Sequence, residues 1–172
     1  MILKNILPVI IISLVMAFLY AASKKKAKED ELGNIILQLP KLYSIFGILI
    51  ILGGIGLLIF ASFFAHEKDS VTAFIASLIA LIAGMFVFAK GYISQIKVTD
   101  SGIIETTIFG KQKEIKWHEI IKLSFGTISL ELKIKSADKT IKAHLHLVGF
   151  QELVYKLENK TGKSRYEMGI LF

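Results

Sequence analysis

Three uncharged and strongly apolar stretches constrain this sequence more than any other feature. They cover Asn5–Ser23, Leu42–Ala65 and Ser70–Ala89. Each is close to the ~20 residues that an α-helix needs to cross the ~30 Å hydrocarbon core of a bilayer. The hydrophobic fraction of the chain, 53%, also exceeds the ~45–50% that is usual in soluble domains. The sequence therefore predicts three transmembrane helices, one within residues 1–23 and a hairpin over 42–92 with helices at 42–65 and 70–90.

The first stretch has a second interpretation, because a short basic start with Lys4 and an apolar core are also typical of a cleaved signal peptide. Its end favours a retained helix. Leu19 or Tyr20 stands where a small residue should precede a cleavage site. Four lysines then follow at once, as in a stop-transfer signal: Lys24, Lys25, Lys26 and Lys28.

The lysines also predict an orientation. Five lysines lie between the first two stretches, within residues 24–41, and only Lys68 lies between the last two. The positive-inside rule therefore places residues 24–41 in the cytoplasm and His66–Ser70 outside. By parity, the N-terminus lies outside and everything after Lys90 is cytoplasmic. Tyrosines at the inner ends of the three helices agree with this orientation: Tyr20, Tyr43 and Tyr92.

The segment between the first two stretches ends in a short apolar run, Ile35–Leu39, before Pro40. Such a run can lie on the inner leaflet of the membrane. It can equally be a simple extended connector. We therefore expect residues 24–41 to be a cytoplasmic linker of one kind or the other.

Small residues predict where the later two helices pack, because small side chains let helix backbones approach closely in a membrane. The third stretch has them at four-residue spacing, and the second has a cluster of glycines. A five-residue loop makes the two helices a tight antiparallel hairpin. The alternative is that the glycines are scattered over a lipid-facing surface. The predicted packing residues are Gly53, Gly54, Gly56, Ala76, Ala80 and Gly84.

From residue 93 the hydrophobic period changes to two, which is typical of antiparallel strands with one buried face. For example, Ile128, Leu130, Leu132 and Ile134 alternate with polar residues. Turn signals separate six such strands, at 93–99, 103–109, 112–117, 120–125, 128–135 and 140–147. An amphipathic helix should begin within two residues of Gly149 and end near Lys160. The predicted core residues are Ile115, Trp117, Leu130, Leu132, Phe150, Leu153, Val154 and Leu157.

Several short motifs accompany these strands. They are the turns Asp100–Ile103 (DSGI) and Phe109–Lys111 (FGK), the run Ile115–Ile120 (IKWHEI), and the lead-in Leu39–Tyr43 (LPKLY). Together they resemble bacterial membrane-anchored proteins with a pleckstrin-homology-like (PH-like) domain. The resemblance implies that residues 93–172 form an antiparallel barrel or sandwich of about six to seven strands, capped by the C-terminal helix. Domains of this kind bind lipids, peptides or proteins.

The charge pattern argues against two classes of ligand, phosphoinositides and nucleic acids. Phosphoinositide-binding members of that group carry paired basic residues around the first strands, whereas Lys97 here stands alone until Lys111. Specific phosphoinositide binding is therefore not expected, although diffuse attraction to anionic lipid is. The net charge of +7 raises the question of nucleic acid. The lysines beside the apolar stretches account for much of it, and those after residue 92 are interleaved with acids, so nucleic-acid binding is not predicted.

No pattern in the sequence predicts catalysis or a cofactor. The chain has no cysteine, and a metal site needs three or four converging ligands. His144 and His146, with Lys142, are predicted on one solvated face of the same strand, and His118 lies in the run Trp117–Glu119 (WHE). Trp117 and Phe125 could form an aromatic ligand patch, but core packing is the favoured role of Trp117. The apolar stretches lack interior ionisable residues, which argues against an ion or proton pathway.

The sequence thus predicts a non-enzymatic protein of the cell membrane that presents a PH-like interaction domain in the cytoplasm. Its expected partners are the lipid bilayer and an unidentified cytoplasmic protein or peptide. The alternative is an accessory subunit of a membrane transport or secretion complex, assembled through the small-residue face of the third helix.

The orientation can be tested with a reporter that is active only in the cytoplasm. Because lysines are biased toward the cytoplasmic side, we expect activity when the reporter follows Phe172 and silence when it is inserted between Glu67 and Asp69. The reverse pattern would place residues 93–172 outside the cell.

Overall fold

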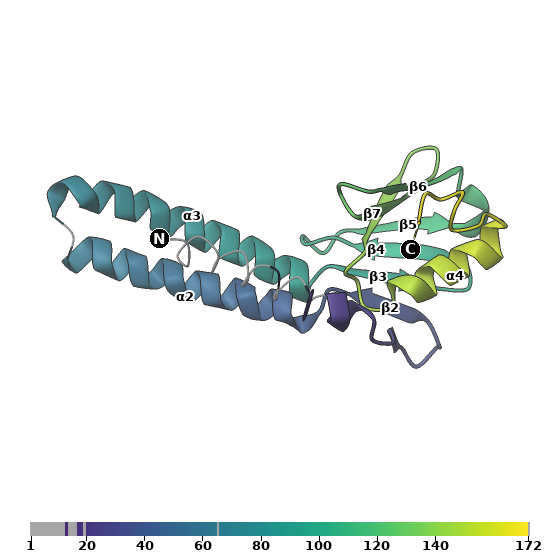
Figure 1. Cartoon of the computed structure of the whole chain (residues 1–172), viewed down its shortest axis with the longest axis horizontal. Coiled ribbons are helices and arrows are strands. Elements are labelled where there is room, and N and C mark those ends of the chain that lie inside the picture. Colours follow the sequence, from purple (N-terminus) through teal and green to yellow (C-terminus); the bar gives the residue numbers. More distant parts are fainter. Residues whose placement is uncertain (1–12, 14–16, 19, 65, 172) are drawn as a thin grey trace. The chain divides into compact units, whose positions relative to one another are not determined.

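The computed structural model describes residues 13, 17–18, 20–64 and 66–171 (Figure 1). By its internal contacts the chain divides into two compact units. The helical unit contains Lys41–Ser94 together with Thr107–Gly110. The sheet unit contains the described residues up to Pro40, Gln95–Thr106 and the residues from Lys111 onward.

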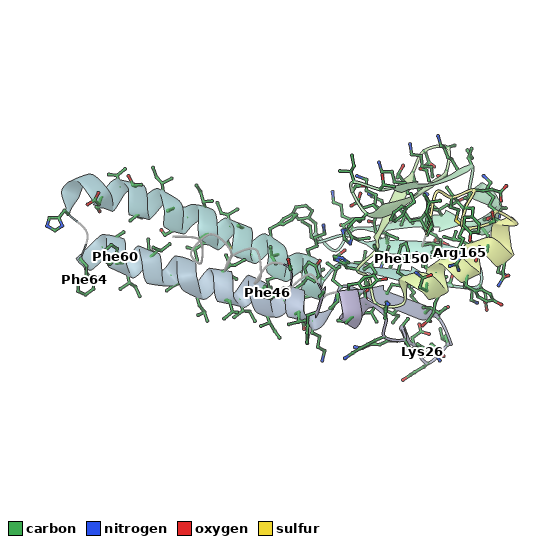
Figure 2. All side chains as sticks on the ribbon, in the orientation of Figure 1. Lys26, Phe46, Phe60, Phe64, Phe150 and Arg165 are labelled. Carbon is green, nitrogen blue, oxygen red and sulfur yellow. The ribbon has the colours of Figure 1, made fainter. Side chains whose placement is uncertain are left out.

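The helical unit is a hairpin of α2 (Lys41–Phe63) and α3 (Glu67–Tyr92). Both helices are long and apolar enough to cross a membrane. Only 17% and 11% of their most apolar windows are buried, whereas the core helix of a soluble protein would be mostly buried. Near the end of α2, Phe60 stacks on Phe64 with ring centroids 6.4 Å apart, and both rings are exposed (Figure 2). These features indicate a membrane location.

The prediction of three membrane-spanning helices is wrong in number, because the described chain contains two helices that qualify. Most of the predicted first helix, Asn5–Ser23, lies outside the described residues. Its end, residues 20–23, is helical. Ser23 is buried there and belongs to the sheet unit. Of the other described residues of this stretch, Ala22 is half-buried and the rest are exposed: Ser13, Ala17, Phe18, Tyr20 and Ala21.

Small residues at seven-residue spacing form the contact between α2 and α3. On α2 they are Gly47, Gly54 and Ala61, which are its buried residues. A Cβ atom at Gly84 of α3 would lie 2.9 Å from the backbone nitrogen of Ile51, and one at Gly54 3.0 Å from the Leu81 side chain. Ser70 donates its hydroxyl to the Ala61 carbonyl at 3.1 Å. The facing residues of α3 follow the same spacing: Ser70, Ser77, Gly84 and Gly91.

This spacing decides where the predicted packing residues lie. Gly54 and Gly84 are in the contact, whereas a Cβ at Gly53 or Gly56 would meet no atom within 4 Å. Ala76 is exposed and Ala80 is half-buried. A seam between two helices that wrap around each other advances by about 3.5 residues per turn. It therefore returns to the same line every seven residues rather than every four.

In the described residues, the sheet unit contains two antiparallel sheets, the helix α4 (Phe150–Thr161) and the helical residues 20–23 (Figure 1). The first sheet has the order β1 (Lys28–Glu29), β2 (Ile35–Gln38), β3 (Gln95–Val98), β4 (Gly102–Thr106) and β5 (Gln112–Lys116). After the short 3-10 turn η1 (Trp117–Glu119), the second sheet contains β6 (Lys122–Gly126), β7 (Glu131–Lys135) and β8 (Thr140–His144). The prediction of a barrel or sandwich of about six to seven strands within residues 93–172 is therefore wrong. The strands form no closed barrel but separate sheets of five and three, and β1 and β2 of the first sheet lie before the hairpin.

The prediction for the C-terminal helix is confirmed. Helix α4 (Phe150–Thr161) starts after Gly149, whose φ of 82° suits glycine, and ends before Gly162 at φ 70°. A side chain on Gly149 would also collide with Ala27. Four predicted core residues are the buried face of α4: Phe150, Leu153, Val154 and Leu157.

The remaining predicted core residues divide into two groups. Ile115 and Leu132 are fully buried. Trp117 is half-buried and donates its indole N–H to the carbonyl of Asp100 at 3.0 Å. Leu130 lies before β7 with φ 52°, a left-handed conformation. The predicted strand 128–135 therefore begins only at Glu131, and Ile128 is 99% exposed in the turn.

The predicted linker is part of the first sheet. Ile35–Gln38 pairs along its length with β3, and Leu37 is fully buried. Asp30 makes the preceding turn: its carboxylate accepts hydrogen bonds from the backbone N–H groups of Leu32 and Asn34. Gly33 in that turn has a φ of 76°. Neither a membrane-surface segment nor a simple connector describes this structure.

Replacing Leu153 with alanine should lower the free energy of unfolding of the sheet unit by ~2–5 kcal/mol, a typical large-to-small core penalty. Leu153 is fully buried, whereas Tyr155 on the same helix is 63% exposed, so Tyr155→Ala is the matched control. Trp117 is the single tryptophan of the chain. Its fluorescence during urea unfolding of the full-length protein in detergent reports on this unit. Equal stability of the two variants would show that α4 does not close the core.

Candidate interaction surfaces

The connection between the two units is the first feature with functional meaning. Gln38 at the end of β2 lies opposite Gln95 at the start of β3, and their side chains share a hydrogen bond of 3.0 Å. Leu39 and Pro40 lead from β2 into α2, and Ile93 and Ser94 lead from α3 into β3. The helical hairpin is therefore inserted between two paired neighbouring strands. Both of its ends start from one point of the sheet, so they lie on the same side of any membrane that the hairpin crosses.

An ion pair fixes the N-terminal strands to the rest of this sheet. The Lys97 ammonium of β3 lies 2.7 Å from the Asp30 carboxylate. This pairing, helped by the hydrogen bonds from Asn34, holds the pKa of Asp30 well below its ordinary value. The turn residues Asp30, Gly33 and Asn34 are the sequence signal that could have revealed the β1–β2 hairpin.

The outer edge of β5 is open. Trp117, which follows β5, donates its backbone N–H to the Ser101 carbonyl at 3.2 Å. Along an antiparallel pair of strands, the residue pairs alternate. In one pair the backbone N–H and C=O groups bond to the opposite residue, and in the next pair they point away from the partner strand. Given the register of β4 and β5, Ile115 therefore bonds to β4, while the backbone groups of Gln112 and Glu114 point away from the sheet. In the described chain these outward groups have no hydrogen-bond partner.

The neighbouring groups mark the limits of this edge. Beyond Glu114, the outward N–H of Lys116 donates to the Glu119 carboxylate at 3.0 Å. Every residue of β5 except Ile115 is exposed. A short extended segment could therefore add to the sheet here through main-chain hydrogen bonds.

The other sheet edges differ from β5. At β1, Ala27 donates its N–H to the Glu152 carboxylate of α4 at 2.9 Å, and at β6, Phe125 donates its N–H to the Met168 carbonyl at 2.7 Å. The edge of β8 is open at Thr140 and Lys142 by the same alternation, because Leu145 donates to the Leu130 carbonyl. However, Thr140 is half-buried, whereas Gln112 and Glu114 of β5 are both exposed, so this edge is less accessible than that of β5.

A cleft of about 450 Å³ lies beside the start of α4. Its wall includes Lys24 and Arg165 as well as Phe150, and Figure 2 shows Phe150 and Arg165 in this part of the sheet unit. Both cations already have neighbours. The Lys24 ammonium lies 4.6 Å from the centre of the Tyr20 ring, and Arg165 lies 3.7 Å from the Glu158 carboxylate. Arg165 is therefore paired with a carboxylate, whereas Lys24 has an aromatic neighbour and keeps its positive charge.

The histidines do not follow the predicted pattern. His144 ends β8, but His146 is in the following turn and only 5% exposed, so the prediction of two solvated histidines on one strand face is wrong for His146. The two rings are 4.9 Å apart, and His146 donates its backbone N–H to Nδ1 of His144 at 3.1 Å. His118 is exposed in η1. Among the described residues no three potential ligands come together to hold a metal ion.

Comparisons of this chain with protein-family models, with curated proteins and with solved structures found no match. Its function is therefore argued from its own geometry.

Burial of His146 makes the stability of the sheet unit depend on pH. Desolvation lowers the pKa of its imidazole below the ordinary 6.5, so the folded state favours the neutral ring while the unfolded chain takes up a proton. The contribution of the neutral His146 ring to the free energy of unfolding is fully present above pH 6.5 and is lost as the pH falls through the folded-state pKa. We expect the urea midpoint to fall as the pH is lowered below 6.5, and His146→Gln to fall less steeply. Parallel pH profiles of parent and variant would contradict this assignment, and the exposed His118→Gln serves as the control.

Proposed function

We propose that this protein is a non-enzymatic membrane-anchored interaction module. Its helical hairpin anchors the sheet unit at the cytoplasmic face of the membrane, and the open edge of β5 binds an extended segment of a partner protein. The observation that carries the proposal is the insertion of the hairpin between the paired strands β2 and β3. A folded unit attached at both ends of a membrane hairpin is held close to the bilayer.

The orientation follows from the lysines. Both ends of the hairpin leave from one point of the sheet, so the segment before α2 and the chain after α3 share one side. That side carries the cluster Lys24–Lys28, and the loop between the helices carries Lys68 alone. The positive-inside rule assigns the lysine-rich side to the cytoplasm.

The binding role rests on the edge of β5. Main-chain hydrogen bonds to an exposed strand provide affinity for an extended peptide with little demand on its sequence. Charged side chains beside such an edge also discourage indiscriminate pairing with other chains, and Lys111, Lys113 and Lys116 stand beside this one. The resemblance of residues 93–172 to PH-like domains is a further reason to favour binding over catalysis, and it stays a prediction.

The alternative of an accessory subunit relied on Ala76, Ala80 and Gly84 of α3 as an assembly face. Gly54 and Gly84 pack against the other helix of the same hairpin. Gly84 is therefore occupied within one chain, whereas Ala76 is exposed and Ala80 is half-buried, so the contact within the hairpin takes up only part of that face.

Site-specific photo-crosslinking in the native membrane tests the β5 edge. A photoreactive amino acid at Lys111, next to the edge, should cross-link a partner protein. Glu114→Pro removes an outward N–H and should abolish the cross-link, because proline cannot donate to an added strand. Glu114→Ala retains the N–H and should preserve it. Lys142→Pro places the same change on the other open edge and should also preserve it.

Trp117 fluorescence confirms that each variant is folded before it is compared. A cross-link that survives Glu114→Pro would exclude the β5 edge as the binding surface. A cross-link lost equally in Lys142→Pro would show that proline acts through the fold, and Gln112→Pro would then decide between the two explanations.

A further inference from the structure

The outward face of the second sheet is an array of lysines. Along β6, β7 and β8 the buried residues Leu123, Leu132, Ile134, Ile141 and Ala143 alternate with outward ones. Register places Lys122 directly opposite Lys135, and Lys133 directly opposite Lys142. Because opposite residues share a face, these four lysines form a staggered group over three strands, with one lysine on β6, two on β7 and one on β8. We call this group the lysine face.

This arrangement is unfavourable for folding by itself. Side chains directly opposite one another have Cβ atoms ~4.5–5.5 Å apart, and like charges at that distance destabilise a sheet. None of the four lysines forms a salt bridge in the part of the chain that the structure describes. Glu131, opposite His144, is the acidic residue at the end of the same face. Other lysines of the sheet unit do have acidic partners, such as Lys97 with Asp30 and Lys113 with Glu105.

The geometry of the array suits a surface that carries many anions. Neighbouring strands are ~4.8 Å apart and alternate residues along a strand are ~6.7 Å apart, so the four ammonium groups are close together on one side of a sheet. Among the described residues of β6, β7 and β8, the one ring on this face is that of His144, which lies opposite Glu131 at the end of the array. Proteins that bind single-stranded nucleic acid combine such a charge with aromatic rings on which bases stack, so a surface of anionic head groups fits the face better.

The chain itself brings such a surface near. Only Leu39–Pro40 and Ile93–Ser94 separate the sheet unit from the candidate membrane helices. A short tether raises the effective concentration of lipid head groups around the sheet unit. At a high effective concentration, contacts that are weak individually can give binding. Anionic lipids are concentrated in the cytoplasmic leaflet.

We infer that the lysine face binds the phosphate groups of anionic lipids in the membrane that anchors the chain. The inference rests on the proposed function for the cytoplasmic orientation. It concerns a different surface from the β5 edge, so binding of a partner and binding of lipid are separate properties of one anchored unit.

A single label on the lysine face tests this inference in the full-length protein. The chain has no cysteine, so Ser124→Cys, on the same face of β6, gives one site for a fluorophore. The protein is reconstituted in vesicles of phosphatidylcholine, alone or mixed with phosphatidylglycerol, that carry a quencher on the lipid head groups. We expect stronger quenching in the phosphatidylglycerol vesicles, and loss of that difference at high salt because exposed charges are screened.

A matched pair of double variants assigns the effect to the lysine face. Lys133→Gln with Lys142→Gln should abolish the phosphatidylglycerol-dependent quenching. Lys156→Gln with Lys160→Gln on α4 removes the same net charge and should leave it intact. Equal loss in both double variants would overturn the inference, because net charge alone would then explain the attraction.

The remaining outcomes are also decisive. Equal quenching in both kinds of vesicle would exclude recognition of anionic lipid, while the cross-link at β5 and the reporter orientation would be unaffected. Complete displacement by a single-stranded oligonucleotide at concentrations below that of the lipid would assign the face to nucleic acid instead. A chain that stays in the aqueous fraction during reconstitution would overturn the membrane anchor, and this inference with it.

Discussion

The pairing of β2 with β3 is the constraint on which the rest of this structure depends. The two strands are separated in sequence by the entire helical hairpin, yet Ile35–Gln38 and Gln95–Val98 match residue for residue. Closing so long a loop costs conformational entropy, but that cost grows only slowly with loop length. The hairpin also forms its own close contact along the line of Gly47, Gly54 and Ala61. A self-packed hairpin brings its two ends together, so that the strands can pair across its base.

The two units of the chain follow different packing rules, those of a helix pair in lipid and those of a domain in water. In the hairpin, apolar side chains are exposed and small residues are buried, the reverse of a soluble helix pair, because association of helices in lipid depends on close packing. In the sheet unit, large apolar residues such as Ile103 and Leu153 are buried on both sides of the core. Polar and charged residues cover its outside. Two surfaces of the sheet unit depart from the usual pairing of polar groups in a soluble domain. In the described chain, the β5 edge has backbone groups without a hydrogen-bond partner, and the lysine face has ammonium groups without a salt bridge.

Several predictions failed because they assigned structure from the local sequence pattern alone. The run Ile35–Leu39 is apolar because β2 is paired with β3, which lies some sixty residues later. Its hydropathy alone therefore did not separate it from a membrane-surface segment, and the turn residues Asp30, Gly33 and Asn34 before it were the local signal of a hairpin. Ile128 and Leu130 fit the alternation of a strand, but a turn with Leu130 at φ 52° takes them out of it. His146 continued the period of β8 in sequence, whereas the strand ends at His144 and the following turn buries the ring.

The sequence by itself determined the elements whose cause is local. Uninterrupted apolar stretches specify α2 and α3, and the spacing of Phe150, Leu153, Val154 and Leu157 between two glycines specifies α4. Alternation specifies most of β3 to β8 and the burial of Ile115 and Leu132. The tertiary structure decided everything that depends on register: the membership of β2 in the first sheet, the seven-residue seam of the hairpin, the open edge of β5, and the meeting of Lys133 with Lys142. Register is set by the sum of many contacts across distant segments, and a shift of one residue would turn every side chain of a strand to the opposite face.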